Sequence, residues 1–333
     1  MCARNKKDFN NISLKSYLEY WFEEIYSVKV ESTTRMLGAY VLYRLIEPCL
    51  EKDVALNHVN SEYINAILKK SSKITVSAGN KSRELLNMAF KEAVDMGYIH
   101  NNPVTGSKKY PRRTPNVTIL NKEQIKVLLN AAKDGSWYLE IMLALFCGLR
   151  KGEIMGLRFS DVDFDAGTIH ICRQLTSDHK VKKGKFEISK YAVTEKPPKT
   201  DNSYRTLKIP MEVLDELAKR KMQIDELKKS VLFIGEHDYV SCQFNGLPHS
   251  VSAMNTALNR LCDRNALPRI SPHGLRHNYA TILLESGVEI AKISALLGHS
   301  SVNTTFECYC DVMEGQNSII TFMNDNFKVQ EVK

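Results

Sequence analysis

The segment SWYLEIMLALFCG, residues 136–148, constrains the fold of this chain more than any other feature. It is apolar on nearly every face, so a helix formed by it has to be enclosed by other elements. A membrane-spanning helix needs about 18 or more consecutive apolar residues, and no apolar run in the sequence reaches that length. The segment therefore predicts the central helix of a globular core, and no membrane partner.

A linker separates two regions of different character. Residues 100–117, HNNPVTGSKKYPRRTPNV, are rich in Pro, Gly, Asn and basic residues, which is typical of a linker. Before it, residues 11–100 show apolar positions at helical spacing and no strand signal, and Asn60 is a candidate N-cap for one of these helices. This predicts a small helical domain, and a length of 333 residues is consistent with two domains.

The region after the linker combines helices with a few strands. Asn121, with Gln124 three residues later, predicts a capped helix start. Four segments have strand composition: residues 168–175, 191–200, 204–210 and 231–235. The second and third flank DNS, a turn composition, so we expect them to form a hairpin. The sequence predicts a mostly α-helical fold with a small antiparallel β-sheet, of the α+β class.

The net charge of +8 is concentrated towards the N-terminus. Residues 1–114 contain 18 Lys and Arg against 12 Asp and Glu, whereas residues 115–333 contain 28 against 26. A basic half favours a polyanion partner, and nucleic acid first. Four linker residues either follow a phosphate backbone or only keep the linker solvated: Lys108, Lys109, Arg112 and Arg113.

Cysteine usage and the N-terminus indicate the compartment. The eight cysteines are scattered and form no C-x-x-C pair, so neither a zinc site nor a thioredoxin-type motif is indicated. The first residues are polar and contain no apolar secretory segment. We therefore expect reduced thiols and a cytoplasmic protein.

Three residues are candidates for chemistry because of their positions. Arg150 follows the apolar helix and a glycine turn, where it is either a fixed cation or an ordinary surface arginine. Lys199 precedes the DNS turn, where it is either a projecting reactive amine or a solvated lysine. Tyr309 stands between Cys308 and Cys310, and a single tyrosine is most often a packed aromatic side chain.

The segment SPHGLRHNY predicts a helix that begins at Ser271 and Pro272. His273 and Arg276 share one face of its first turn, where backbone amides and the helix dipole favour an anion such as phosphate. His277 stands four residues after His273, but a glycine takes the place of the glutamate in the H-E-x-x-H zinc motif. We therefore expect no metal site here, and a packing or capping role for His277.

Four motifs occur in one order along the chain: GLRKGEIMGLRFSDVD, PKT, HGLRH and LGHSSVNTTFECY. In this order and spacing, over residues 115–312, the chain resembles the tyrosine recombinases, also called phage integrases. The resemblance implies four parts: a helical, SAM-like core-binding domain at 11–105, a basic linker at 106–117, a catalytic domain at 118–312, and a tail at 313–333 that docks on a neighbouring protomer.

The resemblance also implies cleavage and rejoining of DNA through a 3′-phosphotyrosyl intermediate. Tyr309 attacks, His273 is the base or a phosphate-binding group, and Lys199 is the general acid. Each role meets a chemical demand, because a tyrosine with a pKa of about 10 is a poor nucleophile and the departing 5′-oxygen needs a proton. No residue set resembles a divalent-metal site, and the resemblance implies that no metal or other cofactor is required. ATP is not needed either, since the covalent phosphotyrosine keeps the energy of the broken bond.

The remaining roles implied by the resemblance concern the charge on the phosphate. Arg150 and Arg276 clamp the scissile phosphate, because guanidinium forks match two of its oxygens. His299, in the turn after Gly298, donates to a phosphate oxygen. Glu153 orients the arginine cluster.

Within this chemistry the sequence favours the integrase of a phage or mobile element. A Xer-like resolvase of chromosome dimers or a DNA invertase stays open, because we expect no additional arm-site-binding domain before the first helix. A DNA-binding protein without catalysis is the third possibility. The expected partners are double-stranded recombination sites at the nucleoid, further copies of the chain in a tetramer on DNA, and accessory DNA-bending or directionality proteins.

Overall fold

The computed structural model describes residues 12–51, 54–75, 77–110, 118–181, 184, 186, 188–198, 200–303 and 305–306, without the side chains of residues 178–181 and 188–192. Its contacts divide the chain into two compact units. We call Met1–Pro115 with Asp178–Ala192 the N-terminal unit, and Asn116–Ser177 with Val193–Lys333 the C-terminal unit. The first boundary lies within the predicted linker, and each unit is described separately.

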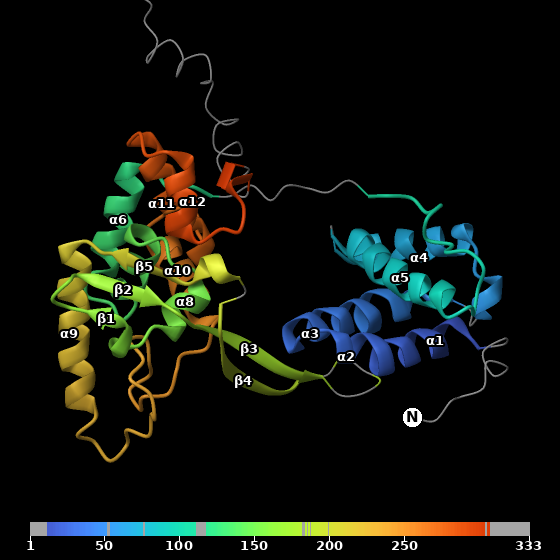
Figure 1. Ribbon diagram of the computed structural model, residues 1–333, viewed down its shortest axis with the longest axis horizontal. Coiled ribbons are helices and arrows are strands. Elements are labelled where there is room, and N and C mark those ends of the chain that lie inside the picture. The colour runs from blue at the N-terminus through green and yellow to red at the C-terminus, as the bar shows by residue number, and fades with distance from the viewer. Residues whose placement is uncertain are drawn as a thin grey trace, which may run out of the picture. The chain divides into compact units, whose positions relative to one another are not determined.

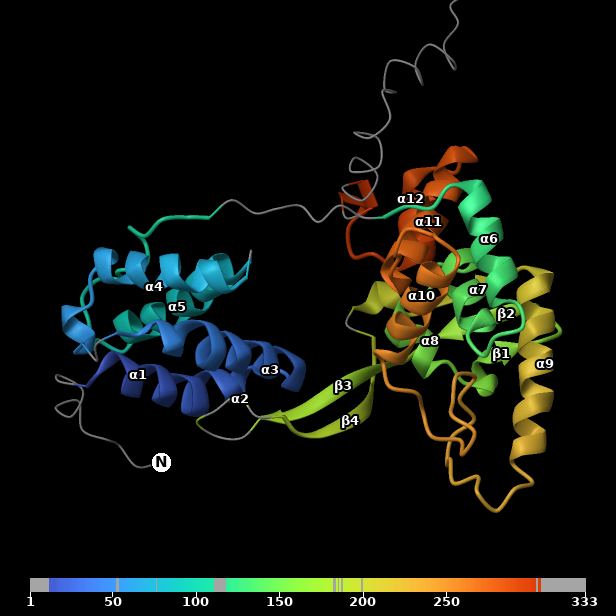
Figure 2. The ribbon, with the colours of Figure 1, turned by 180° about the vertical axis from the view of Figure 1, so that it is seen from behind.

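The N-terminal unit is built mainly from helices. In chain order these are α1 (Leu14–Tyr20), a π-helix (Trp21–Tyr26), α2 (Ser27–Lys29), α3 (Ser32–Tyr40), a second π-helix (Val41–Ile46), two 3₁₀ turns (Glu47–Cys49 and Leu56–His58), α4 (Ser61–Ile74) and α5 (Ala78–Asp95). Asn60 accepts a hydrogen bond from the backbone N–H of Tyr63 over 2.9 Å, which confirms the predicted cap of α4. Figures 1 and 2 show α4 and α5 packed side by side.

Aromatic and aliphatic side chains fill the core of this unit. Tyr17, Phe22 and Phe90 are completely buried. The hydroxyl of Tyr17 donates to the carbonyl of Ala89 over 2.6 Å, so the polar end of a buried ring is satisfied within the core. The amphipathic patterns of the sequence thus become one helical core.

The C-terminal unit has a longer series of helices. They are α6 (Lys122–Ala132), α7 (Tyr138–Phe146), α8 (Lys151–Gly156), two 3₁₀ turns (Phe159–Asp161 and Asp201–Ser203), α9 (Met211–Leu227), α10 (Ala253–Arg264), α11 (Pro272–Glu285) and α12 (Ile290–Leu297). The predicted capping box of α6 is present, since Asn121 and Gln124 exchange hydrogen bonds of 2.9 and 3.0 Å. Ser271 caps α11 as predicted, by accepting from the backbone N–H of Gly274 over 3.1 Å.

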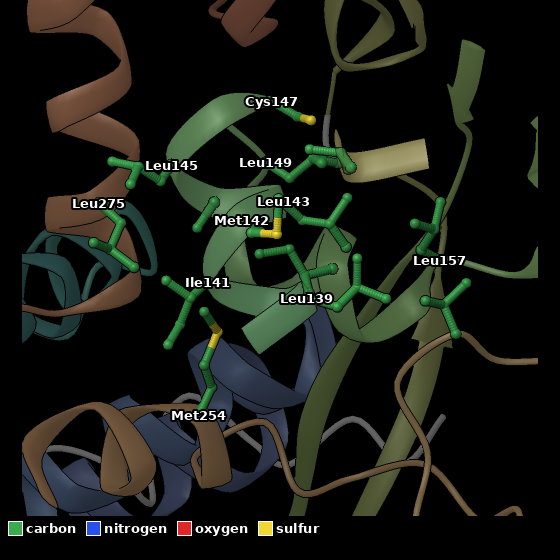
Figure 3. Packing of buried hydrophobic residues seen from close by; sticks show 14 of the residues in the cluster. Leu139, Ile141, Met142, Leu143, Leu145, Cys147, Leu149, Leu157, Met254 and Leu275 are labelled. Carbon is green, nitrogen blue, oxygen red and sulfur yellow. The ribbon is translucent and has the colours of Figure 1, made fainter. Parts of the chain in front are cut away.

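Helix α7 is the centre of this unit, as its apolar sequence predicts. It packs against α11, α9, α6 and α8. Figure 3 shows its side chains pointing in several directions, with Ile141 beside Met254 of α10 and Leu145 beside Leu275 of α11. Among its residues, Leu143, Ala144 and Leu145 are completely buried. A helix enclosed in this way fixes the position of the turn that follows it.

Two small antiparallel sheets accompany the helices. The first has the order β1 (Val162–Asp163), β2 (Thr168–Ile171) and β5 (Arg205–Lys208). Its register places Ile169 opposite Leu207, and both side chains are buried in the core. The second sheet pairs β3 (Gln174–Val181) with β4 (Ile188–Lys196).

Two strand predictions were wrong. The expected hairpin of residues 191–200 and 204–210 does not form, because β4 pairs with β3 and β5 pairs with β2. Segment 231–235 is not a strand either. Its Ile234 and Gly235 backbone N–H groups both donate to the carbonyl of Asn245, which closes a loop, and Val231 is 96% exposed.

The described elements confirm the predicted class, a mostly α-helical fold with small antiparallel sheets. In the part of the chain that the structure describes, no helix has both the length and the apolar character needed to cross a bilayer.

Candidate active site

A glycine turn places Arg150 beside the core helix. Gly148, directly after α7, has a φ of +62°, and a Cβ there would stand 2.4 Å from the ring of Tyr279. Glycine is therefore the residue that fits this left-handed turn. Arg150 is the N-cap residue of α8, and its backbone N–H donates to Glu153 Oε2 over 2.8 Å. The Gly148 turn and the hydrogen bond to Glu153 therefore fix the backbone of Arg150.

The carboxylate of Glu153 lies among three guanidinium groups, and its side chain is only 3% exposed. Arg150 Nη1 donates to Oε1 over 2.7 Å, and Arg276 Nη1 lies 3.9 Å from Oε2. Arg205 forms a fork, with Nη1 3.1 Å from Oε1 and Nη2 2.9 Å from Oε2. Burial alone would raise the pKa of Glu153, but Arg205, followed by Arg150 and Arg276, holds this pKa below its usual value. Glu153 is therefore an anion that holds three cations together.

The same three arginines bind the C-terminal end of α12. Three consecutive carbonyl groups accept one hydrogen bond each: Leu296 from Arg205 Nε over 2.7 Å, Leu297 from Arg276 Nη2 over 2.6 Å, and Gly298 from Arg150 Nη2 over 2.7 Å. Carbonyl groups at a helix C-terminus lack partners within the helix and carry partial negative charge, so cations are stabilised there. One helix end thus gathers three arginines that are far apart in the sequence.

Arg276 has a further anchor. Its Nη1 donates to the carbonyl of Gly148 over 2.7 Å, so it connects the turn after α7 to the end of α12. The Arg276 side chain is 3% exposed, whereas that of Arg150 is 32% exposed. Arg276 therefore lies beneath the surface at which Arg150 is accessible.

A cleft of about 230 Å³ opens beside these groups. It is lined by Arg150, Glu153, Gln174, Pro198, Thr200, Ser203, Gly298, His299 and Ser300. Pro198 and Thr200 are the sequence neighbours of Lys199. The cleft therefore presents an arginine and a histidine on a surface that suits an anion.

His299 follows the left-handed Gly298 turn, whose φ is +65°. Its Nδ1 lies 2.8 Å from the hydroxyl of Thr305, which is buried. Burial first, then the charges of Arg276 and Arg150, lower the pKa of His299 to about 4. The imidazole is therefore neutral at pH 7.

His273 and His277 lie on consecutive turns of α11 and their rings meet edge to face, with centroids 4.4 Å apart. Burial, Arg276 and Arg150 lower the pKa of His273, and burial, His273 and Arg276 lower the pKa of His277 to about 4. His277 thus packs against His273, as its expected packing role requires. Both rings are neutral at pH 7, so the fixed arginines carry the positive charge of this site.

The structure brings together four of the predicted site residues. Arg150 and Arg276 bind carbonyl groups at the end of α12, Glu153 contacts both arginines, and His299 lines the same cleft as Arg150. Several predictions lie outside the described residues, namely Lys199, Tyr309, Arg112 and Arg113. Lys108 and Lys109 are exposed in the N-terminal unit, where the Lys108 backbone N–H donates to Asn65 Oδ1 over 2.7 Å. Their contribution to DNA binding stays a prediction.

Sequence reasoning missed Arg205. It opens β5, where Arg205 and Leu207 alternate with Thr206 and Lys208. Because side chains two residues apart share a face of a strand, the buried Leu207 implies that Arg205 also points inward. This alternation was the signal in the sequence that could have indicated a buried Arg205.

The described residues contain no group of three or more His, Cys, Asp or Glu side chains arranged to hold a metal ion. The polar groups of the cleft are instead cationic or neutral donors beside a buried carboxylate. Such a donor set fits an anionic ligand better than a cation.

Residues 118–315 match the model of the phage integrase family. Over an alignment of 340 residues, the chain is 29% identical to a "Tyrosine recombinase XerC-like" protein of Caldanaerobacter subterraneus subsp. tengcongensis, covering 96% of this chain and 85% of that protein.

Two solved structures share the fold. The Tn1549 transposon integrase in complex with a circular intermediate DNA has a TM-score of 0.70 at 20% identity, covering 88% of this chain and 94% of that one. The lambda integrase tetramer bound to a Holliday junction has a TM-score of 0.63 at 20% identity, covering 90% of this chain and 78% of that one.

Proposed function

Because the chain belongs to the phage integrase family of tyrosine recombinases, we propose that it is a site-specific recombinase of a phage or mobile element, acting through a 3′-phosphotyrosyl intermediate. The observation that carries this proposal is the convergence of Arg150, Arg276 and His299 on the last turn of α12, beside a cleft. Phosphoryl transfer spreads negative charge over phosphate oxygens, so fixed cations aimed at that charge lower the barrier.

The first step exchanges one phosphodiester bond for another. The hydroxyl oxygen of Tyr309 attacks the scissile phosphorus, and the bond from phosphorus to the 5′-oxygen breaks. His273 accepts the tyrosine proton, and Lys199 gives a proton to the departing 5′-oxygen. In the second step the 5′-hydroxyl of a partner strand attacks the phosphotyrosine and releases Tyr309. The number of phosphodiester bonds is unchanged, so no ATP is needed, and in this proposal the two arginines take the charge-stabilising role that a metal ion would otherwise have.

The neutral histidines suit these steps. A histidine must be uncharged to accept a proton, and the lowered pKa of His273 leaves it uncharged at neutral pH. His299 Nδ1 lies 2.8 Å from the Thr305 hydroxyl. We assign Nδ1 as the acceptor of this bond, so that Nε2 carries the proton and donates to a phosphate oxygen. Arg150 and Arg276 supply the charge.

The partners follow from the same chemistry. We propose that the chain binds double-stranded recombination sites at the nucleoid, as a tetramer, with accessory proteins that bend DNA or set direction. Two observations support this assembly: the net charge of +8, and the fold shared with an integrase solved as a tetramer on a Holliday junction. The basic linker residues are proposed to follow the phosphate backbone.

Trapping the covalent intermediate tests this function. The protein is expressed in bacteria that carry the candidate element, the cells are lysed under denaturing conditions, and DNA attached to the purified protein is sequenced. We expect attached DNA with one sharp 3′ end from the wild type and none from Tyr309→Phe. Absence of a covalent complex from the wild type, also with a nicked substrate containing the element ends, would contradict the proposal.

A housekeeping resolvase is the second candidate, because a relative aligned over 96% of this chain is described as XerC-like. The same trapping experiment separates the two functions. Attached DNA from the ends of an integrated element supports the integrase, whereas attached DNA from one chromosomal site, in cells with and without the element, supports the resolvase.

A further inference from the structure

We infer that Arg205 is a positioning residue of the recombination site: it joins Glu153 to the last turn of α12, and thereby sets the geometry of Arg150, Arg276 and His299. The inference rests on the proposed function and extends it to a residue outside the predicted set. Arg205 is 7% exposed and is not one of the residues that line the cleft. It therefore acts through its neighbours and not on DNA.

The hydrogen bonds of Arg205 reach three separate segments. Its Nη1 and Nη2 hold both carboxylate oxygens of Glu153, and its Nε donates to the carbonyl of Leu296. Nη1 also donates to the carbonyl of Ser203 over 3.1 Å, at the end of the 3₁₀ turn Asp201–Ser203. One planar guanidinium thus connects α8, α12 and the turn before β5.

Each of these partners controls a group of the cleft. Glu153 accepts from the backbone and side chain of Arg150, so a displaced carboxylate displaces the arginine. Leu296 lies in the last turn of α12, three residues before His299. The close packing around Gly298, whose Cβ would meet the Asn202 carbonyl at 2.8 Å, leaves little space for adjustment. Loss of the Arg205 contacts therefore shifts the guanidinium groups of Arg150 and Arg276 and the imidazole of His299 together.

A lysine at position 205 cannot make the same set of contacts as Arg205. A guanidinium presents five N–H donors in a fixed plane, whereas an ammonium is a point charge on a flexible stem. Lysine at position 205 would keep the charge beside Glu153 but lose the simultaneous fork and carbonyl contacts. A displacement of about 1 Å at a reacting centre costs on the order of 100-fold in rate.

The structure provides a matched control within the same unit. Arg220 of α9 donates to both carboxylate oxygens of the buried Glu140, over 2.9 and 3.4 Å, and to the carbonyls of Val240 and Ser136. This is the same chemical arrangement, but its residues do not line the cleft beside Arg150. Arg220→Lys therefore reproduces the structural cost of Arg205→Lys without touching the proposed site.

The experiment measures single-turnover formation of the covalent complex on a nicked substrate that carries the DNA end recovered by trapping. Full-length wild type, Arg205→Lys, Arg205→Gln and Arg220→Lys are compared, at a temperature where circular dichroism shows each one folded. We expect Arg205→Lys to lose about 10- to 100-fold in rate with DNA affinity unchanged, and Arg220→Lys to stay within about threefold of wild type. If Arg205→Gln fails to fold, Arg205→Lys carries the test.

The dependence of the rate on pH gives a second readout. The charged groups that face Glu153 are Arg205 of β5, Arg150 at the start of α8 and Arg276 of α11. Arg205 is the largest of the influences that lower the pKa of Glu153, so Arg205→Gln raises it. The acid limb of the rate profile should therefore move to higher pH in Arg205→Gln and stay in place in Arg220→Lys.

The outcomes are distinguishable. Equal rates for Arg205→Lys and Arg220→Lys, together with a pH profile of Arg205→Gln that matches the wild type, would overturn the positioning role while leaving the proposed function intact. If the wild type forms no covalent complex, the proposed function falls and the inference that rests on it falls as well.

Discussion

The charges of the candidate site are divided between two kinds of residue. Arg150, Arg205 and Arg276 are permanently charged, and the carboxylate of Glu153 holds them together. Burial, followed by the charges of Arg276 and Arg150, lowers the pKa of both His273 and His299 and keeps these rings neutral. A site arranged in this way can stabilise an anionic transition state with arginines while histidines exchange protons or donate hydrogen bonds.

The buried histidines predict how stability changes with pH. The pKa of His277 is about 4 in the folded protein, below the value of about 6.5 for an unfolded chain. Between these values the unfolded chain binds more protons, so the free energy of unfolding falls as the pH falls from 6.5 towards 4. Over that range we expect His277 to account for a loss of about 2–3 kcal/mol.

Chemical denaturation of the wild type and of His277→Asn, at pH values from 7 to 4.5, measures this loss. The variant should show a shallower decline, because one titrating group has been removed. His170→Asn, at an exposed position of β2, should keep the slope of the wild type. Equal slopes in all three proteins would contradict the prediction.

The end of α12 is the element around which the site is built. Its last carbonyls receive three arginines from α11, β5 and the start of α8. A helix C-terminus suits this purpose, because several acceptors point the same way and carry partial negative charge. The arginines are therefore positioned by backbone acceptors before any phosphate arrives.

The glycine turn after α7 leads to a second prediction, which compares alanine substitutions at Gly148 and Gly287. Alanine at position 148 has to adopt a φ near +62° and has to displace the Tyr279 ring, which lies 2.4 Å from its Cβ. Alanine at position 287 meets a similar φ of +80° with no atom within 4 Å. Gly287→Ala should cost about 1–2 kcal/mol of unfolding free energy from backbone strain alone.

Gly148→Ala should cost about 1–3 kcal/mol more, because overpacking adds to the strain. It should also slow covalent complex formation at least 10-fold, since the Gly148 carbonyl holds Arg276. Denaturation curves and single-turnover cleavage of both variants measure these effects. A Gly148→Ala protein as stable and as active as Gly287→Ala would show that the turn does not position the arginines.

The molecule as a whole divides into two compact units, and the candidate site belongs entirely to the second. The first unit carries exposed Lys108 and Lys109 and the whole excess of positive charge, since it has 23 Lys and Arg against 14 Asp and Glu, whereas the second unit has 23 against 24. Binding that neutralises phosphates releases counterions and weakens as salt is added. Under the proposed function, we expect both units to contribute to DNA affinity and the second unit to carry the chemistry.

The C-terminal tail makes a prediction about assembly. Its sequence contains Ile319, Ile320, Phe322, Met323 and Phe327, an apolar set that is expected to dock on a neighbouring protomer. Deletion of residues 315–333 should leave binding to a single half-site within about threefold of the full chain, and abolish cooperative binding to a full site. Gel-shift titrations on half-site and full-site DNA test this. A truncated protein that still forms tetramers on DNA would refute the docking role.

Local sequence patterns were sufficient for much of the fold. The caps at Asn60, Asn121 and Ser271 formed as predicted, because a cap is satisfied by an N–H only two or three residues away. The apolar segment at 136–148 became the central helix because every face of it demands burial. The order of the four motifs indicated the family that residues 118–315 match.

Other features depended on contacts between residues distant in the sequence. Arg205 reaches Glu153 across 52 residues and Leu296 across 91, and no local pattern specifies those partners. The predicted pairing of residues 191–200 with residues 204–210 was wrong for the same reason. The partner of β5 was set by burial of Leu207 against the core and not by the nearby turn. A sequence determines which residues must be buried or capped, because those demands act over a few neighbours. The arrangement of three arginines around one helix end arises only when the core has placed α8, β5, α11 and α12 together.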